Sequence, residues 1–189
     1  MNLPNKITLA RIMLIPIMVA VFYIDAIPYA PLWAAGIFAI ASFTDFLDGY
    51  IARSRGLVTN MGKFLDPIAD KVLVVVALFL LVDIEAVPAP FGAIGSSIIV
   101  ARELIVSGFR QIAAANNVVI AADKSGKIKT CLQIAAILLL MVRAAFLGSE
   151  AVWFSVLSYI GYAVGCLAVL MTLYSGINYI VKNKQVLKS

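Results

Sequence analysis

The sequence predicts an all-α integral membrane protein with six transmembrane helices, an N-terminal interfacial segment and both termini in the cytoplasm. Of the 189 residues, 63% are hydrophobic and only 13% are charged, whereas about a quarter of a soluble domain is charged. The mean hydropathy is +1.02, and the apolar segments reach the roughly 20 residues that a helix needs to cross a bilayer. We therefore expect a single membrane domain over residues 1–189.

Short connections separate the expected spans. Pro31 suits the start of the second span, because a proline lacks the N–H group that the first helical turn leaves unpaired. A Val-Pro-Ala-Pro segment at residues 87–90 is typical of a connection between helices. The polar beginning of the first span is expected to lie along the membrane interface. The six spans are expected near residues 7–24, 31–54, 62–81, 93–115, 126–147 and 151–181.

The distribution of lysine and arginine predicts the orientation. Basic residues gather near the N-terminus, in the connections at 53–63 and 110–129, and in the C-terminal tail, and only Arg143 falls on the other side. Because cytoplasmic segments carry the excess of positive charge, both termini should be cytoplasmic. Contact with anionic membrane lipids explains the net charge of +5, so no nucleic-acid partner is expected.

Four aspartates form a pattern at membrane depth. Asp45 and Asp48 are three residues apart on the second expected helix, and Asp66 and Asp70 are four apart on the third. Residues at these spacings share a helix face, so the four carboxylates converge if the two helices pack side by side. A charged group at membrane depth costs at least a few kcal/mol, which makes function the first hypothesis for it.

The side chains available as metal ligands limit which metal ions and which kinds of catalysis are expected. The sequence contains no histidine, which excludes histidine acid–base catalysis, Ser-His-Asp triads and histidine metal sites. Clustered carboxylates favour Mg²⁺, Mn²⁺ or Ca²⁺ over zinc. Four of them suit two ions, which can hold the attacking and leaving oxygens of a phosphate displacement. Gly49 and Ala52 continue the stripe of Asp45 and Asp48; they either admit a ligand close to the backbone or permit close helix packing.

The pattern Asp45-x2-Asp48-Gly49-x2-Ala52-Arg53-x8-Gly62-x3-Asp66-x3-Asp70 resembles the signature of the CDP-alcohol phosphatidyltransferases. The resemblance implies a homodimeric six-helix enzyme that uses divalent metal, Mg²⁺ or Mn²⁺ and two ions, to move a phosphatidyl group from a CDP-linked donor to an alcohol. It implies a general-base role for Asp70. It also implies metal ligation by Asp45, Asp48, Asp66 and Asp70, and CDP contacts by Gly49, Ala52, Arg53 and Gly62.

Residues 3–8, 63–71, 101–104 and 122–130 further resemble the bacterial phosphatidylglycerophosphate synthases. That resemblance implies CDP-diacylglycerol as donor, sn-glycerol 3-phosphate as acceptor, and a site that faces the cytoplasm from the bacterial cytoplasmic membrane. Two alternatives stay open. One is another acceptor, such as inositol phosphate. The other is a metal-ion transporter, because intramembrane carboxylates also mark ion pathways.

A phosphorylated acceptor needs a second anion site near the metals. Arg110 ends a polar stripe with Glu103 and Ser107 on the fourth expected helix, and Lys124 and Lys127 lie at the start of the fifth. Arginine binds phosphate through two parallel hydrogen bonds, and lysine acts as a point charge. We expect Arg110 and Lys127, then Lys124, to bind the acceptor. The alternatives are a structural pair between Arg110 and Glu103, and lysines that only set the topology.

Overall fold

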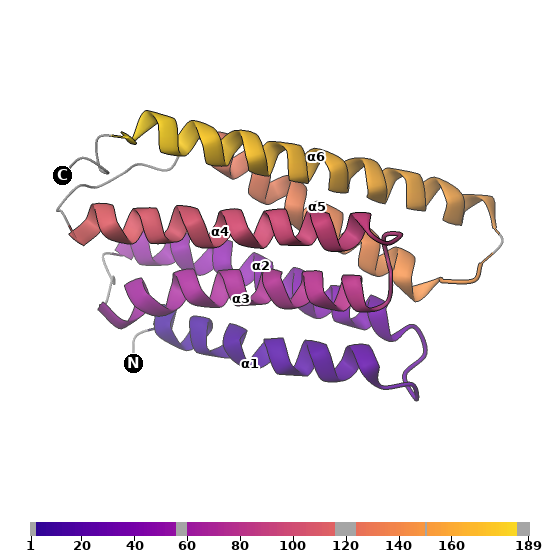
Figure 1. Ribbon diagram of the computed structural model, residues 1–189. Helices are drawn as coiled ribbons and strands as arrows, with labels where there is room; N and C mark the ends of the chain where they lie inside the picture. The colour runs from indigo at the N-terminus through magenta and orange to yellow at the C-terminus, as the bar shows by residue number, and fades with distance from the viewer. Residues whose placement is uncertain (1–2, 56–59, 116–123, 150, 185–189) are drawn as a thin grey trace.

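The computed structural model describes residues 3–55, 60–115, 124–149 and 151–184, and within these residues it contains six α-helices (Figure 1). Each coincides with one of the six segments expected from hydropathy. The first begins at the third residue and continues through Pro16, so the polar start is part of the same helix. The helices are α1 (Leu3–Tyr23), α2 (Ala30–Arg55), α3 (Asn60–Asp83), α4 (Phe91–Ala115), α5 (Lys124–Ala145) and α6 (Val152–Lys182).

The helices form an up-and-down bundle. The start of α1 and the end of α6 lie at the same end of the bundle (Figure 1), which we call the terminal end. The ends of α2 and α4 and the starts of α3 and α5 lie there too. Helix α1 packs against α2 and α3, α5 packs against α2 and α6, and α4 packs against α3 and α6. The aspartate-bearing parts of α2 and α3 therefore belong to the terminal end.

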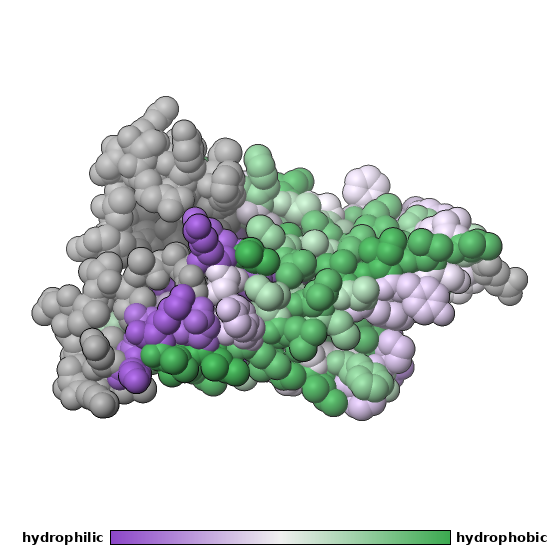
Figure 2. Space-filling view, turned by 90° about the horizontal axis from the view of Figure 1, so that it is seen from above, coloured by the Kyte–Doolittle hydropathy of each residue, from purple (hydrophilic) through white to green (hydrophobic). Residues whose placement is uncertain are grey.

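The surface agrees with a membrane protein. Among the described residues, three helical segments are long and apolar enough to cross a bilayer, namely Phe91–Ala113, Lys124–Ala145 and Val152–Lys182. Shorter apolar helical segments cover Ile7–Tyr23 and Ala30–Thr44. Figure 2 shows hydrophobic side chains along the length of the bundle and the most hydrophilic ones toward the terminal end. Six spans and cytoplasmic termini remain predictions.

The core joins the N-terminal helices to α5. Met18, Phe38, Leu73, Ile137 and Met141 are all at most 1% exposed, and they come from α1, α2, α3 and α5. These side chains hold the four helices against one another by close van der Waals packing, which drives association of helices in a membrane. This core fixes α3 relative to α5 near the candidate site.

A buried arginine joins α1 to α2. Arg11 is fully buried, and its Nε donates a hydrogen bond of 3.2 Å to the carbonyl oxygen of Ala41. Thr8, one turn earlier, is also fully buried. Arg11 is one of the basic residues near the N-terminus, which were expected to face the cytoplasm and the headgroups, but the structure buries it between α1 and α2. Its partner Ala41 lies one turn before Asp45 on α2.

Candidate functional site

The four signature aspartates lie at the terminal end of the bundle. Asp45 and Asp48 belong to the last three turns of α2, Asp66 and Asp70 belong to the first three turns of α3, and the two helices are in contact. The side chains of the first three lie outside the described residues, whereas Asp70 is described and half-buried. The described side chains contain no group of three His, Cys, Asp or Glu residues that could hold a metal, so convergence of the carboxylates stays a prediction.

The expected nucleotide contacts lie on the same two helices. Gly49, Ala52 and Arg53 belong to the end of α2, and Gly62 belongs to the first turn of α3. Their side-chain surroundings also lie outside the described residues. Helix α2 thus carries the proposed nucleotide contacts within two turns of its two aspartates.

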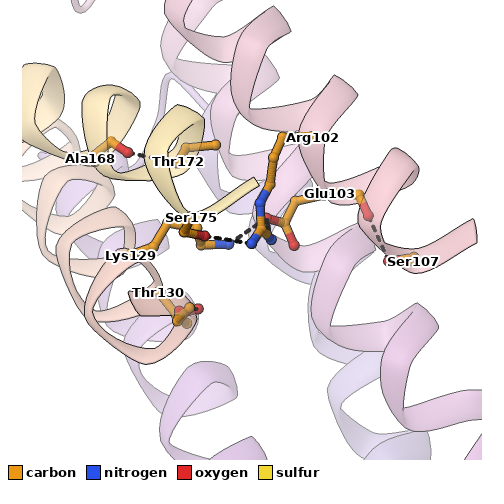
Figure 3. Close-up of polar contacts among 9 residues, drawn as sticks. Arg102, Glu103, Ser107, Lys129, Thr130, Ala168, Thr172 and Ser175 are labelled. Carbon is orange, nitrogen blue, oxygen red and sulfur yellow. Dashed lines mark hydrogen bonds and ion pairs between the residues drawn. The ribbon is translucent and has the colours of Figure 1, made fainter. Parts of the chain in front are cut away.

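Arg102, Glu103 and Lys129 form an ion cluster between α4 and α5 (Figure 3). Lys129 of α5 is 3% exposed, and its ammonium forms an ion pair with the Glu103 carboxylate of α4. The same carboxylate oxygen, Oε1, accepts a hydrogen bond of 3.1 Å from Nη1 of Arg102. Helices α4 and α5 therefore bring one carboxylate and two cations together.

Helix α6 holds the arginine of this cluster. Nη2 of Arg102 donates a hydrogen bond of 2.6 Å to the Ser175 hydroxyl, and Ser175 is 1% exposed. A Cβ atom added to Gly176 would lie 3.0 Å from Cγ of Arg102, so the arginine crosses α6 where a side chain is missing. Nε of Arg102 is the one buried side-chain nitrogen or oxygen without a hydrogen-bond partner among the described residues.

The acceptor candidates lie at the surface of the same end. Arg110 is exposed, and it lies against Tyr179 of α6, with Nε 3.5 Å from the hydroxyl oxygen and the guanidinium 5.7 Å from the ring centroid. Lys124 and Lys127 are exposed on the first turn of α5. Glu103 pairs with Arg102 and Lys129, so the Arg110–Glu103 pair that the sequence left open is not the pairing found. Binding of a phosphate by these three cations stays a prediction.

The sequence argument missed Lys129 as a candidate. The signal was present in the helical spacing, because Lys129 shares a face of α5 with the buried residues Gln133, Ala136 and Leu140. Lys127, two residues earlier, points to a different side of the helix and is exposed. A lysine on the apolar face of a buried helix requires a partner, and Glu103 is that partner.

Comparisons with known proteins agree with the signature. Residues 1–174 match the family described as CDP-alcohol phosphatidyltransferase. Several relatives bear the name CDP-diacylglycerol–glycerol-3-phosphate 3-phosphatidyltransferase. The one from Bacillus subtilis (strain 168) is 43% identical over 100% of this chain and 98% of its own length. Those from Rickettsia bellii and Shigella flexneri are 39% and 35% identical, over 94% and 95% of this chain and 93% of their own lengths. The chain therefore belongs to the CDP-alcohol phosphatidyltransferase family.

Proposed function

We propose that this protein transfers the phosphatidyl group of CDP-diacylglycerol to the hydroxyl of sn-glycerol 3-phosphate, and so forms phosphatidylglycerophosphate and CMP. The observation that carries the proposal is the near full-length similarity, at 35–43% identity, to relatives named for this reaction. The complete signature in α2 and α3 supports the same conclusion. Phospholipid synthesis is the corresponding cellular role.

The proposed architecture is one membrane domain over residues 1–189, with six spans and cytoplasmic termini. It would lie in the bacterial cytoplasmic membrane with the site facing the cytoplasm, as a homodimer. The support is that the aspartates of α2 and α3, the start of α1 and the end of α6 share one end of the bundle. The basic residues that predict the cytoplasmic side flank the same helix ends.

Asp45, Asp48, Asp66 and Asp70 would hold divalent metal, Mg²⁺ or Mn²⁺ and two ions. The donor set fits, because carboxylate oxygens are the ligands that these hard cations prefer and the contacting helices α2 and α3 carry all four. Bound metal would neutralise charge on the pyrophosphate of the donor. Gly49, Ala52, Arg53 and Gly62 would lie around the CDP moiety.

Asp70 is the proposed general base. As the acceptor oxygen forms a bond to the phosphorus that carries the diacylglycerol, Asp70 takes the hydroxyl proton, and the phosphoanhydride bond to CMP breaks. A half-buried carboxylate suits this role, since it is partly accessible and partly shielded from bulk water. Arg110, Lys127 and Lys124 would bind the phosphate of the acceptor at the adjoining surface.

The test is CMP release by the purified protein in detergent. We expect release to require CDP-diacylglycerol, sn-glycerol 3-phosphate and Mg²⁺ together, and to fall by about 10²-fold or more in Asp70→Asn, since general-base catalysis contributes about 10²–10⁴-fold. Labelled inositol phosphate in place of glycerol 3-phosphate is the matched control, and no product is expected from it. Product from inositol phosphate alone would transfer the proposal to that acceptor, and release without any acceptor would contradict it.

A further inference from the structure

We propose that Arg11 is a positioning residue for Asp45. Together with Thr44 it holds the Ala41 carbonyl, and so it fixes the turn of α2 that carries this aspartate. Divalent metal would then bind tightly only while Arg11 keeps this contact. The inference rests on the proposed metal site, and it concerns a residue of α1, a helix that carries none of the signature residues.

The first support is the burial of a permanent charge. Arg11 lies inside the apolar segment Ile7–Tyr23 of α1, and it is fully buried. Because a guanidinium keeps its charge in proteins, its removal from water is costly. Ionisable residues inside membrane helices are functional candidates by default. Arg11 therefore requires an explanation beyond the positive charge of cytoplasmic segments.

The second support is the backbone carbonyl through which Arg11 contacts α2. Nε of Arg11 donates a hydrogen bond of 3.2 Å to the Ala41 oxygen, and the Thr44 hydroxyl donates one of 2.7 Å to the same oxygen. In an α-helix each amide donates to the carbonyl four residues earlier, so Ala41 is also the helical acceptor for the amide of Asp45. Two side chains and the backbone of Asp45 therefore share one oxygen atom.

This shared oxygen influences the direction of α2 at Asp45. A carbonyl oxygen has two lone pairs, so side-chain donors compete with the helical hydrogen bond, and such insertions change the local direction of a helix. The Arg11 donor comes from α1, which packs against α2. The contact with α1 would thus set the position of the turn that carries Asp45. Groups that orient a metal ligand contribute about 10–100-fold to metal affinity.

Two substitutions separate position from charge. Arg11→Lys retains the positive charge but places a methylene where arginine has Nε, so the Ala41 oxygen loses that donor. Arg11→Met removes the donor and the charge together. If Arg11 acts through position, both variants should bind metal more weakly. If it acted only as a positive charge near the metal, Arg11→Met would bind more tightly and Arg11→Lys would be unchanged.

The experiment is titration of the purified full-length protein in detergent with Mn²⁺, with free Mn²⁺ measured by electron paramagnetic resonance. We expect Arg11→Lys and Arg11→Met each to raise the Mn²⁺ dissociation constant by about tenfold. Arg143→Met is the matched control, because Arg143 also donates to a backbone carbonyl, that of Ala86, but at the opposite end of the bundle. It should lower the unfolding temperature yet leave the dissociation constant within about twofold, since distant sites are energetically independent.

Asp45→Asn separates the two possible failures. If the wild-type protein binds no Mn²⁺, or if Asp45→Asn binds it as tightly as the wild type, the proposed metal site is wrong and the inference with it. If Asp45→Asn binds more weakly but Arg11→Lys binds like the wild type, or Arg11→Met binds more tightly, only the inference is overturned.

Thr44→Val decides if neither Arg11 variant folds. It removes the second donor to the Ala41 oxygen and keeps the shape of the side chain. A raised Mn²⁺ dissociation constant in Thr44→Val supports the inference, and an unchanged or lower one contradicts it.

Discussion

The guanidinium of Arg102 and the hydroxyl of Ser175 form a hydrogen bond of 2.6 Å that connects α4 to α6. The same guanidinium donates a hydrogen bond to Glu103, which pairs with Lys129, so the contact connects α6 to the ion cluster of Arg102, Glu103 and Lys129. Helix α6 contributes none of the signature residues. Its effect on the site is therefore expected to act through this arginine.

Substitution of Ser175 tests that connection. Ser175→Ala removes a hydrogen bond to a charged group, and we expect a loss of about 1.5–3 kcal/mol of stability. The matched control is Thr172→Val, one turn earlier on α6, because the buried Thr172 hydroxyl donates only within its own helix, to the Ala168 carbonyl at 2.6 Å (Figure 3). Thermal unfolding in detergent measures both. Equal losses in the two variants would contradict the role given to Ser175.

Gly176 provides a steric test of the same arginine. In Gly176→Ala the new Cβ would lie 3.0 Å from Cγ of Arg102, so the arginine must shift by a few tenths of an ångström, which disturbs its hydrogen bond to Ser175. We expect a net destabilisation of about 1 kcal/mol or more, because overpacking of this kind costs about 1–3 kcal/mol. The control is Gly165→Ala on the same helix, where nothing lies within 4 Å of the added atom. Its unfolding temperature should be unchanged or higher, since alanine favours a helix over glycine by about 1 kcal/mol.

Arg143 stabilises the opposite end of the bundle. It donates hydrogen bonds of 2.9 Å to the Ser158 hydroxyl and the Ala86 carbonyl, and its guanidinium lies 5.3 Å from the ring centroids of Phe154 and Tyr162. We expect Arg143→Met to lower stability by about 2–4 kcal/mol, through the lost charged hydrogen bonds and cation–π contacts. CMP release per folded molecule should stay within about twofold, because Arg143 is far from α5's first turns. A selective rise in the KM for either substrate would contradict this separation.

Arg110 tests the proposed acceptor site. Arg110→Ala should raise the KM for glycerol 3-phosphate by about tenfold and leave the KM for CDP-diacylglycerol nearly unchanged, because a charged hydrogen bond to phosphate contributes about 1.5–3 kcal/mol. Tyr179→Phe, which removes only the hydroxyl near Arg110, should have a smaller effect. Initial-rate kinetics with each substrate varied in turn give both constants. If the donor KM rose instead, Arg110 would belong to the nucleotide site.

The exposed lysines of α5 should attract the phosphate of the acceptor through long-range electrostatic interactions. Lys124→Gln and Lys127→Gln are each expected to raise the KM for glycerol 3-phosphate about two- to fivefold at low ionic strength. The difference from wild type should shrink as salt is added, since exposed charges are screened over about 10 Å at 0.1 M. Initial rates over a series of salt concentrations measure this. A difference that does not depend on salt would indicate direct, desolvated contact with the acceptor.

The positions of the helices and the family of the protein could be predicted from the amino-acid sequence. Apolar segments of membrane-spanning length predicted the six helical ranges, and the spacing from Asp45 to Asp70 identified the family that comparison then confirmed. Both are local properties, since hydropathy and signature spacing need no knowledge of neighbouring helices. The roles of the individual signature residues remain predictions, because most of their side chains lie outside the described residues.

Which basic residues are buried was decided by tertiary structure alone. Lys124, Lys127 and Lys129 form one basic segment of the sequence. Of these three, only Lys129 faces the interior of the bundle, where it forms an ion pair with Glu103 of α4. Arg11 resembles a headgroup-facing residue in sequence, yet it lies fully buried against Ala41. The physical reason is that helical periodicity determines which residues share a face of a helix. The packing of the other helices determines which of these faces is buried and which side chains it contacts.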